Sequence, residues 1–276
     1  MKIYDQQHIR QFYDDYAEQE TLRWNKSIVE QVKYHVHLHY LDRYIQTDEV
    51  VLELGAGTGM FTRELAKRSA NNTITDLSPV QLSLNQQRAT TEAYEDRIRA
   101  WAHADICDLS AFDENQFDKV LCYGGPLSYV FEQKRVALRQ IKRVLKPGGI
   151  ALFSVMNLWG TVHEYLMKGI MPYSVEDNEK VIQSGNLHPS SFTASDHHCH
   201  MFTSDEIKKD VAEVGFKLLD LSASNCLSAN RADDLEQIRK DAEKWDYFLS
   251  LELRACCSPG MIESGTHIIF VVQKSE

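Results

Sequence analysis

A short apolar run followed by alternating glycines constrains the fold of this chain more than any other stretch. The run begins at Val50 and ends at Leu52, and Gly55, Gly57 and Gly59 follow at every second position. An apolar run, a glycine-rich turn and a helix-compatible segment predict a buried strand that bends sharply into a helix. Glycines let the backbone approach a small molecule closely, and a helix N-terminus offers unpaired N–H groups. The stretch predicts an α/β fold with a ligand site at this turn.

Glu53, two residues before the first glycine, discriminates between two kinds of ligand. A carboxylate at this position repels a pyrophosphate, and the G-x-G-x-G spacing differs from the G-x-G-x-x-G dinucleotide fingerprint. A ligand that carries an ammonium group and a positive sulfur is attracted instead. S-adenosylmethionine is such a ligand. A NAD(P)-type nucleotide-dependent oxidoreductase is the alternative that Glu53 and the glycine spacing disfavour.

Composition and charge exclude several classes of function. The formal net charge is −10 and no tract is rich in Lys or Arg, which disfavours nucleic acid as a partner. No apolar run approaches the roughly 18 residues that span a bilayer, and the first residues lack an apolar signal region. The six cysteines lack C-x-x-C spacing, so reduced thiols are expected. We therefore expect a cytoplasmic protein without a membrane partner.

The first 47 residues predict helices that precede the sheet. Ile28, Val32 and Val36 recur on one helical face, and Tyr13 and Tyr16 lie one turn apart further upstream. Such rings either pack the helix on the core or close over a ligand. Residues 1–47 are therefore predicted to form an N-terminal helical cap.

Acidic residues end the second and third predicted strands. Asp76 closes the strand 72–76, and Asp105 closes the strand 97–105. In a doubly wound sheet the carboxyl ends of neighbouring strands meet at the ligand crevice. Asp76 is therefore expected to accept hydrogen bonds from two ribose hydroxyls, and Asp105 from an exocyclic amino group such as adenine N6. Ser78 and Pro79 supply the cap and first turn of the next helix, so Asp76 is not needed for that role.

The remaining core pattern alternates strands and helices. Strands are predicted at 116–122 and 150–156, with a helix at 134–145 between them. Five strands separated by helices predict a parallel α/β sheet. Two more strands are predicted at 216–221 and 266–272, with a long charged helix at 231–254 between them.

Residues 158–201 lose this periodicity and predict a lid or substrate-binding insertion. The segment ends in His197-His198-Cys199-His200. Alternate residues of an extended segment face opposite ways, so all four cannot bind one metal ion without a sharp bend, and no metal site is predicted. If methyl transfer needs a base, His198 or His200 is the candidate, with Tyr129 positioning the acceptor.

The sequence is similar to the class I S-adenosylmethionine-dependent methyltransferases of small-molecule type. The resemblance rests on Val51–Gly59, Asp76, Asp105 and Arg143–Gly149, in that order. It implies a Rossmann-like, doubly wound, seven-stranded sheet, mostly parallel with an antiparallel last strand. The helical cap would be 1–47, the methyltransferase core 48–157 and 202–276, and the insertion after the fifth strand 158–201.

The resemblance also implies roles for particular residues. The methionine part of the cofactor would be held by Glu53, Gly55, Ala56, Gly57 and Gly59, with Cys122 and Tyr123 facing the same end. The ribose would bind Asp76, and the adenine would bind Asp105, Ile106 and Leu77. Tyr13 or Tyr16 would close over the cofactor.

The implied reaction is in-line methyl transfer from S-adenosylmethionine, with S-adenosylhomocysteine as product. Amino-methylating enzymes of nucleic-acid bases carry an Asn- or Asp-Pro-Pro-aromatic signature after the fourth strand, and this chain has Cys122–Pro126 there instead. A small-molecule acceptor is therefore predicted. A non-catalytic module that only binds S-adenosylmethionine is a second alternative. The residues leave the acceptor, the methylated atom and the oligomeric state open.

Overall fold

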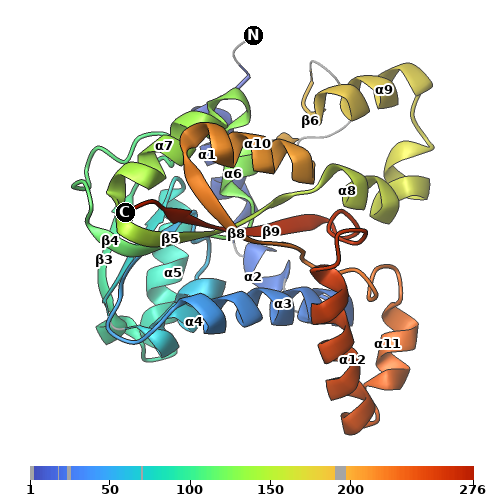
Figure 1. Cartoon of the computed structure of the whole chain (residues 1–276), viewed down its shortest axis with the longest axis horizontal. Coiled ribbons are helices and arrows are strands. Elements are labelled where there is room, and N and C mark those ends of the chain that lie inside the picture. Colours follow the sequence, from blue (N-terminus) through green and yellow to red (C-terminus); the bar gives the residue numbers. More distant parts are fainter. Residues whose placement is uncertain (1–2, 18, 24–25, 70, 190–196) are drawn as a thin grey trace.

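Seven strands form one twisted sheet at the centre of the protein (Figure 1). This computed structural model describes residues 3–17, 19–23, 26–69, 71–189 and 197–276. The strand order is β3-β2-β1-β4-β5-β9-β8. The strands are β1 (Val50–Leu54), β2 (Asn71–Asp76), β3 (Ile98–His103), β4 (Phe117–Cys122), β5 (Leu145–Met156), β8 (Phe216–Ala223) and β9 (His267–Lys274).

Strand direction confirms the predicted Rossmann-like sheet. The neighbours from β3 to β5 all pair in parallel. The last strand, β9, runs antiparallel to both β5 and β8. Because the chain order reverses between β1 and β4, the carboxyl ends of these two strands border a crevice.

Helices cover both faces of the sheet, as a doubly wound fold requires. Helices α3 (Ile28–Tyr44), α4 (Met60–Arg68) and α12 (Ala242–Cys256) bury side chains against one face. Helices α7 (Lys134–Val144) and α10 (Ser204–Val214) do so on the other. Helix α5 (Pro79–Thr91) packs beside β2 and β3 at the sheet edge. Each layer buries one apolar face of the sheet, which drives folding.

A smaller apolar cluster lies between the N-terminal region and the segment that follows β5. It joins α1 (Gln6–Tyr16), the short α6 (Pro126–Tyr129), α8 (Leu158–Tyr165) and α9 (Val175–Ser184). Its buried members are Ile9, Tyr129, Leu158, Val181, Cys199 and Met201. The remaining short elements are α2 (Gln19–Arg23), β6 (Asn186–Leu187), β7 (Cys199–His200) and α11 (Ala232–Ile238), with single turns at Glu95–Arg97, Phe131–Gln133 and Leu166–Ile170.

The division into a cap, a core and an insertion stays a prediction. Within residues 1–47, α1 packs over the crevice side, whereas α3 buries Val36, Tyr40 and Leu41 against the sheet itself. Part of the 158–201 segment lies outside the described residues. Among the described residues, no helix combines the length and the apolarity that crossing a bilayer requires.

Two predicted boundaries are wrong. The single helix expected at 231–254 is two helices, α11 and α12, because Asp241 adopts an extended conformation and its side chain caps α12 by accepting from the Lys244 N–H. The strand expected from Ile150 begins at Leu145, since Leu145 pairs with Phe117 before an irregularity in the register. Local proline and glycine signals hid this pairing.

Candidate functional site

A cleft lies at the carboxyl ends of the central strands. It holds about 860 Å³ of empty space, including its open mouth. The segments that follow β1, β2, β3 and β4 all contribute to its wall, and α1 and α6 add aromatic rings. The lining residues are Tyr4, Ile9, Tyr13, Glu20, Glu53, Gly55, Ala56, Gly57, Thr58, Met60, Phe61, Asp76, Leu77, Ala104, Asp105, Ile106, Tyr123, Gly124, Pro126, Tyr129 and Val130.

The glycine turn shapes one end of this cleft. Gly55, Gly57 and Gly59 all have positive φ angles, of 65°, 54° and 88°. A Cβ at Gly55 would lie 2.3 Å from Cγ of Pro126, so the turn approaches the β4 loop too closely for any side chain. Gly59 is the N-cap of α4 and faces the Asn85 side chain, outside the cleft lining. Gly55, Ala56 and Gly57 line the cleft, as predicted for the cofactor loop.

Glu53 is a buried acid at the end of β1. Its side chain is 3% exposed, and Oε2 accepts a hydrogen bond of 2.6 Å from the Thr62 hydroxyl. Burial raises the pKa of Glu53 to about 8, the Thr62 hydrogen bond opposes this rise, and the nearby charge of Asp76 adds to it. With this pKa the carboxyl is mostly protonated at pH 7.

Asp76 ties the second strand to the glycine turn. Oδ2 accepts from the Gly57 N–H at 2.8 Å, and Oδ1 accepts from the Ser78 N–H at 2.8 Å. Burial raises the pKa of Asp76 to about 6, against the lowering effect of these two donors. Ser78 caps α5 by accepting from the Gln81 N–H, which leaves Asp76 available to the cleft, as the sequence predicted.

Asp105 is oriented by a residue that the sequence did not reveal. Its Oδ1 accepts from the Cys107 N–H at 2.8 Å, and its Oδ2 accepts from the Tyr4 hydroxyl at 2.7 Å. Burial and the Asp105 carboxylate together raise the pKa of Tyr4, so the phenol keeps its proton as donor. Ile106 and Leu77, which were predicted to contact the adenine, also line the cleft, and that role stays a prediction.

Tyr13 and Tyr16, either of which was predicted to close over the cofactor, have different surroundings. Tyr13 lines the cleft and meets the ring of Tyr129 edge to face, with centroids 5.4 Å apart. Tyr16 stacks on Phe12 at 5.9 Å and borders a separate outer hollow. Of the two tyrosines proposed to close over the cofactor, Tyr13 is therefore among the described lining residues and Tyr16 is not.

The two residues that end β4 also have different surroundings. Tyr123 lines the cleft and packs edge to face with Phe61 and His37, at centroid distances of 5.1 and 4.8 Å. Cys122 is fully buried in the core on the opposite side of the strand and is absent from the lining. Successive strand residues face opposite sides of a sheet, so the Cys122 side chain points into the core while Tyr123 faces the cleft.

The predicted catalytic residues are not gathered in one place. Tyr129 lines the cleft, and its hydroxyl lies 3.0 Å from Nε2 of His197. His198 stacks on His8, with ring centroids 4.2 Å apart. The described cleft lining includes neither His198 nor His200.

His200 belongs to an ionic cluster between α7 and α10. Its Nδ1 lies 2.7 Å from the Asn186 amide oxygen, and its Nε2 lies 2.9 Å from a Glu206 carboxylate oxygen. Burial raises the pKa of Glu206, but His200 and Lys134 outweigh it and hold that pKa at about 2. These contacts link the end of the 158–201 segment to the core.

Tyr4, Glu20, Pro126 and His197 are site residues that sequence reasoning missed. Tyr4 and Glu20 line the cleft from the N-terminal region, and no periodic signal marks either position. His197 had a usable signal, because it alternates with the predicted His198 and so faces the opposite side of an extended segment. Pro126 lines the cleft from the loop that follows β4.

Comparison with known proteins identifies the class. Residues 51–149 match the family described as a methyltransferase domain. Together with the seven-stranded sheet and its antiparallel last strand, this match shows that the chain contains a class I S-adenosylmethionine-dependent methyltransferase domain. The cleft fits that cofactor, since buried acids and glycine backbone surround it without a basic side chain among the described lining residues.

Individual relatives agree with this class. A demethylmenaquinone methyltransferase from Clavibacter sepedonicus is 38% identical over 133 residues, which are 46% of this chain and 51% of the relative. The chain thus spans about half the length of the curated relatives that it matches.

Solved structures share the fold. One is an S-adenosylmethionine-dependent methyltransferase from Methanosarcina mazei, with a TM-score of 0.57, 15% identity, and coverage of 86% of this chain and 97% of that one. Another is a phosphoethanolamine N-methyltransferase from Haemonchus contortus in complex with S-adenosylhomocysteine, with a TM-score of 0.54, 20% identity, and coverage of 87% and 52%.

Proposed function

We propose that this protein transfers a methyl group from S-adenosylmethionine to a small-molecule acceptor. The observation that carries the proposal is the set of acids around one cleft: Glu53, Asp76 and Asp105 lie at or just after the carboxyl ends of three adjacent strands, and all line it. S-adenosylmethionine presents an ammonium and sulfonium group, two ribose hydroxyls and an adenine amine. Each acid has one of these groups as its chemical complement.

The binding roles follow from the contacts of each acid. Asp76 uses one lone-pair direction of each oxygen for the Gly57 and Ser78 N–H groups, and the ribose hydroxyls would occupy the others. Asp105 uses one lone pair of Oδ1 for the Cys107 N–H and one of Oδ2 for the Tyr4 hydroxyl, and an adenine amine would occupy a remaining one. Glu53 would face the methionine end, where a positive charge favours its ionised form.

The acceptor side is supported by Tyr129 and His197. When bound, S-adenosylmethionine supplies a methyl group that is already activated on a sulfonium, so the protein mainly needs to align the acceptor and hold its departing proton. Tyr129 lines the cleft, and its hydroxyl lies 3.0 Å from Nε2 of His197, which is not among the described lining residues. The acceptor would pass its proton to Tyr129, and Tyr129 would pass its own proton to His197. The distance between Tyr129 and His197 supports this route better than one through His198 or His200.

A small molecule suits this cleft better than a polymer. The formal net charge of −10 disfavours nucleic acid, and the lining is aromatic and acidic. The relative from Clavibacter sepedonicus is named a demethylmenaquinone methyltransferase, so a phenolic or enolic acceptor is the first class to assay. Phenols and enols carry the acidic proton that a Tyr–His pair can take.

Calorimetry with S-adenosylmethionine tests the cofactor half of the proposal. Asp76→Ala is expected to weaken affinity at least tenfold, because the ribose loses its paired acceptor. Asp96→Ala is the matched control, since Asp96 is 78% exposed and far from the lining, and its affinity is expected to equal that of the wild type. Equal affinities for wild type and Asp76→Ala would refute the ribose assignment.

Formation of S-adenosylhomocysteine tests the catalytic half. Wild-type protein is incubated with the methyl donor and a panel of hydroquinones, catechols and ethanolamine phosphates. Product with any member of the panel establishes turnover. Tight cofactor binding with no product from any of these compounds would instead favour a module that binds S-adenosylmethionine without catalysis.

A further inference from the structure

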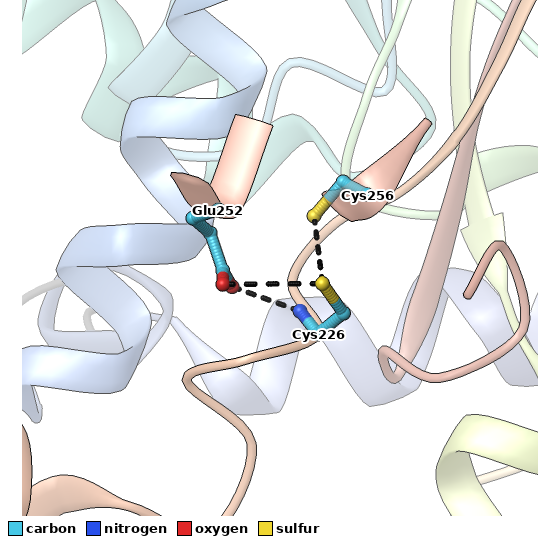
Figure 2. A group of neighbouring side chains, drawn as sticks. All are labelled: Cys226, Glu252 and Cys256. Atoms are coloured by element: carbon cyan, nitrogen blue, oxygen red, sulfur yellow. Dashed lines mark hydrogen bonds between the residues drawn. The ribbon is translucent and has the colours of Figure 1, made fainter. Parts of the chain in front are cut away.

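A group of three buried side chains lies on the face of the sheet that α12 covers, outside the described cleft lining (Figure 2). Cys226 stands on the loop that follows β8, and Glu252 and Cys256 stand one turn apart near the end of α12. Their exposed fractions are 7%, 0% and 0%. Among the residues that the structure describes, this is the one set of three or more His, Cys, Asp or Glu whose ligand atoms all lie within 4.8 Å of one another.

The distances match the span of a tetrahedral thiolate site. The Sγ atoms of Cys226 and Cys256 are 3.7 Å apart. Two thiolates that bind one Zn²⁺ at about 2.3 Å in tetrahedral geometry lie about 3.8 Å from each other. Oε2 of Glu252 is 3.9 Å from Cys226 Sγ, and the three ligand atoms all lie within 4.8 Å of one another, so one ion between them reaches all of them.

Two backbone N–H groups and one side-chain hydroxyl hold the Glu252 carboxylate in this orientation. Oε1 accepts from the Cys226 N–H at 2.8 Å and from the Ser228 hydroxyl at 2.7 Å. Oε2 accepts one short hydrogen bond, from the Leu227 N–H at 2.9 Å, which leaves a lone pair facing the thiols. Carboxylates that bind metal ions are commonly fixed by such hydrogen bonds.

We propose that Cys226, Glu252 and Cys256 bind a zinc-type divalent cation. Binding breaks two S–H bonds, forms two metal–sulfur bonds and releases two protons to solvent. The net charge is unchanged, because an ionised carboxylate with two thiols and a carboxylate with two thiolates and a divalent ion both carry one negative charge. The N–H and hydroxyl donors that surround Glu252 therefore suit both states.

Solvent supplies the fourth ligand and the route of entry. Cys226 and Leu227 border a surface hollow whose wall also includes His163 and Met261. The metal ion ties the 224–231 loop, between β8 and α11, to the end of α12. Its role is structural, since the described residues that line the cofactor cleft do not include any of the three ligands.

Cobalt(II) is the probe that tests this site, because it occupies zinc sites and reports thiolate ligation through sulfur-to-cobalt charge-transfer absorption. Reduced wild-type protein is titrated with Co²⁺ under anaerobic conditions. One equivalent is expected to bind with that absorption and with the intense visible bands of a tetrahedral ion, and one equivalent of Zn²⁺ is expected to displace it. Zn²⁺ is also expected to raise the Tm by several degrees, by mass action on the folded state.

The six cysteines provide matched controls. Cys226→Ser and Cys256→Ser are each expected to abolish the charge-transfer absorption, and Glu252→Gln to weaken Co²⁺ binding at least tenfold. Cys257→Ser, next to a ligand, and Cys199→Ser, buried elsewhere at 1% exposure, are expected to bind like the wild type. Circular dichroism of each metal-free variant shows whether it is folded, and the wild-type titration alone decides the case if a variant is not.

Three results would overturn the proposal. One is that Co²⁺ produces no charge-transfer absorption although a thiol titration in denaturant shows that all six cysteines are reduced. Another is absorption that survives Cys226→Ser and Cys256→Ser. The third is a mass loss of two hydrogens, which assigns the pair to a disulfide instead. Affinity for S-adenosylmethionine is expected to be the same with and without Zn²⁺, so this proposal and the proposed methyl transfer fail separately.

Discussion

Binding of S-adenosylmethionine is expected to depend on pH through Glu53. Burial raises the pKa of this carboxyl to about 8, so most of the free protein holds it neutral at pH 7. A cation at the methionine end of the cleft requires the ionised form, and the proton must leave when the ligand binds. Affinity should therefore rise as the pH increases toward 8.

The size of the effect follows from the ionised fraction. With a pKa of about 8, about 3% of the free protein is ionised at pH 6.5 and about 24% at pH 7.5. The apparent Kd scales inversely with this fraction, so it should fall about eightfold across that interval. Asp76, with a pKa of about 6, is mostly ionised throughout and adds less than about a factor of two.

Isothermal titration calorimetry measures both parts of this linkage. At pH 6.5, close to one proton per bound ligand should be released, visible as a binding enthalpy that varies with the ionisation enthalpy of the buffer. Glu53→Gln should bind more weakly than wild type at pH 7.5 and should lose the pH dependence. S-adenosylhomocysteine keeps the ammonium group and lacks the sulfonium. Comparing the pH dependence of its binding with that of S-adenosylmethionine shows which of the two charges interacts with Glu53.

The same pKa shift predicts how the empty protein responds to pH. Because the folded-state pKa of Glu53 lies above its unfolded value of 4.5, the ionised form opposes folding, and stability should fall as the pH rises from 4.5 to 8. Glu53→Gln should remove this loss, on the order of 5 kcal/mol at alkaline pH, and raise the Tm. If the Kd of the wild type for S-adenosylmethionine does not change between pH 6.5 and 7.5, and binding releases no proton, the role assigned to Glu53 in binding is refuted.

Two further substitutions separate the cofactor turn from the histidine segment. Gly55→Ala places a Cβ 2.3 Å from Pro126 at φ +65°, so thermal melts should show a loss of about 3 kcal/mol and calorimetry a loss of cofactor affinity. His200→Ala removes the contacts to Asn186 and Glu206, and should lower the Tm by about 4–8 °C with S-adenosylmethionine affinity unchanged. Normal stability with reduced turnover in His200→Ala would instead restore its predicted catalytic role.

Local patterns were enough to predict the sheet and several residues that line the cleft. The glycine turn after β1 and the acid that ends β2 lie within a few residues of the strands that place them. Because parallel strands bring their carboxyl ends to one edge, these local signals also predicted which residues meet: Glu53, Asp76 and Asp105 all line one cleft. Because these strands run in the same direction, residues that are far apart in the sequence meet at one edge of the sheet.

Contacts between distant segments were beyond such reasoning. Tyr4 and Asp105 are 101 residues apart, and Tyr129 and His197 are 68 residues apart, yet each pair is within hydrogen-bond distance. No periodicity specifies how α1 lies over the cleft or which histidine of an extended segment turns inward. The packing of α1, α6 and α8 into one apolar cluster decides both.

The sequence by itself therefore determined the α/β class, the strand-turn-helix at Glu53 and the methyl-donor class, because each depends on spacing within one strand–helix unit. Tertiary structure alone decided the burial that shifts the pKa of Glu53, the partner of Tyr129 and the meeting of Cys226 with Cys256. Burial and contact between distant residues are properties of the packed layers, and they arise only when helices close on both faces of the sheet.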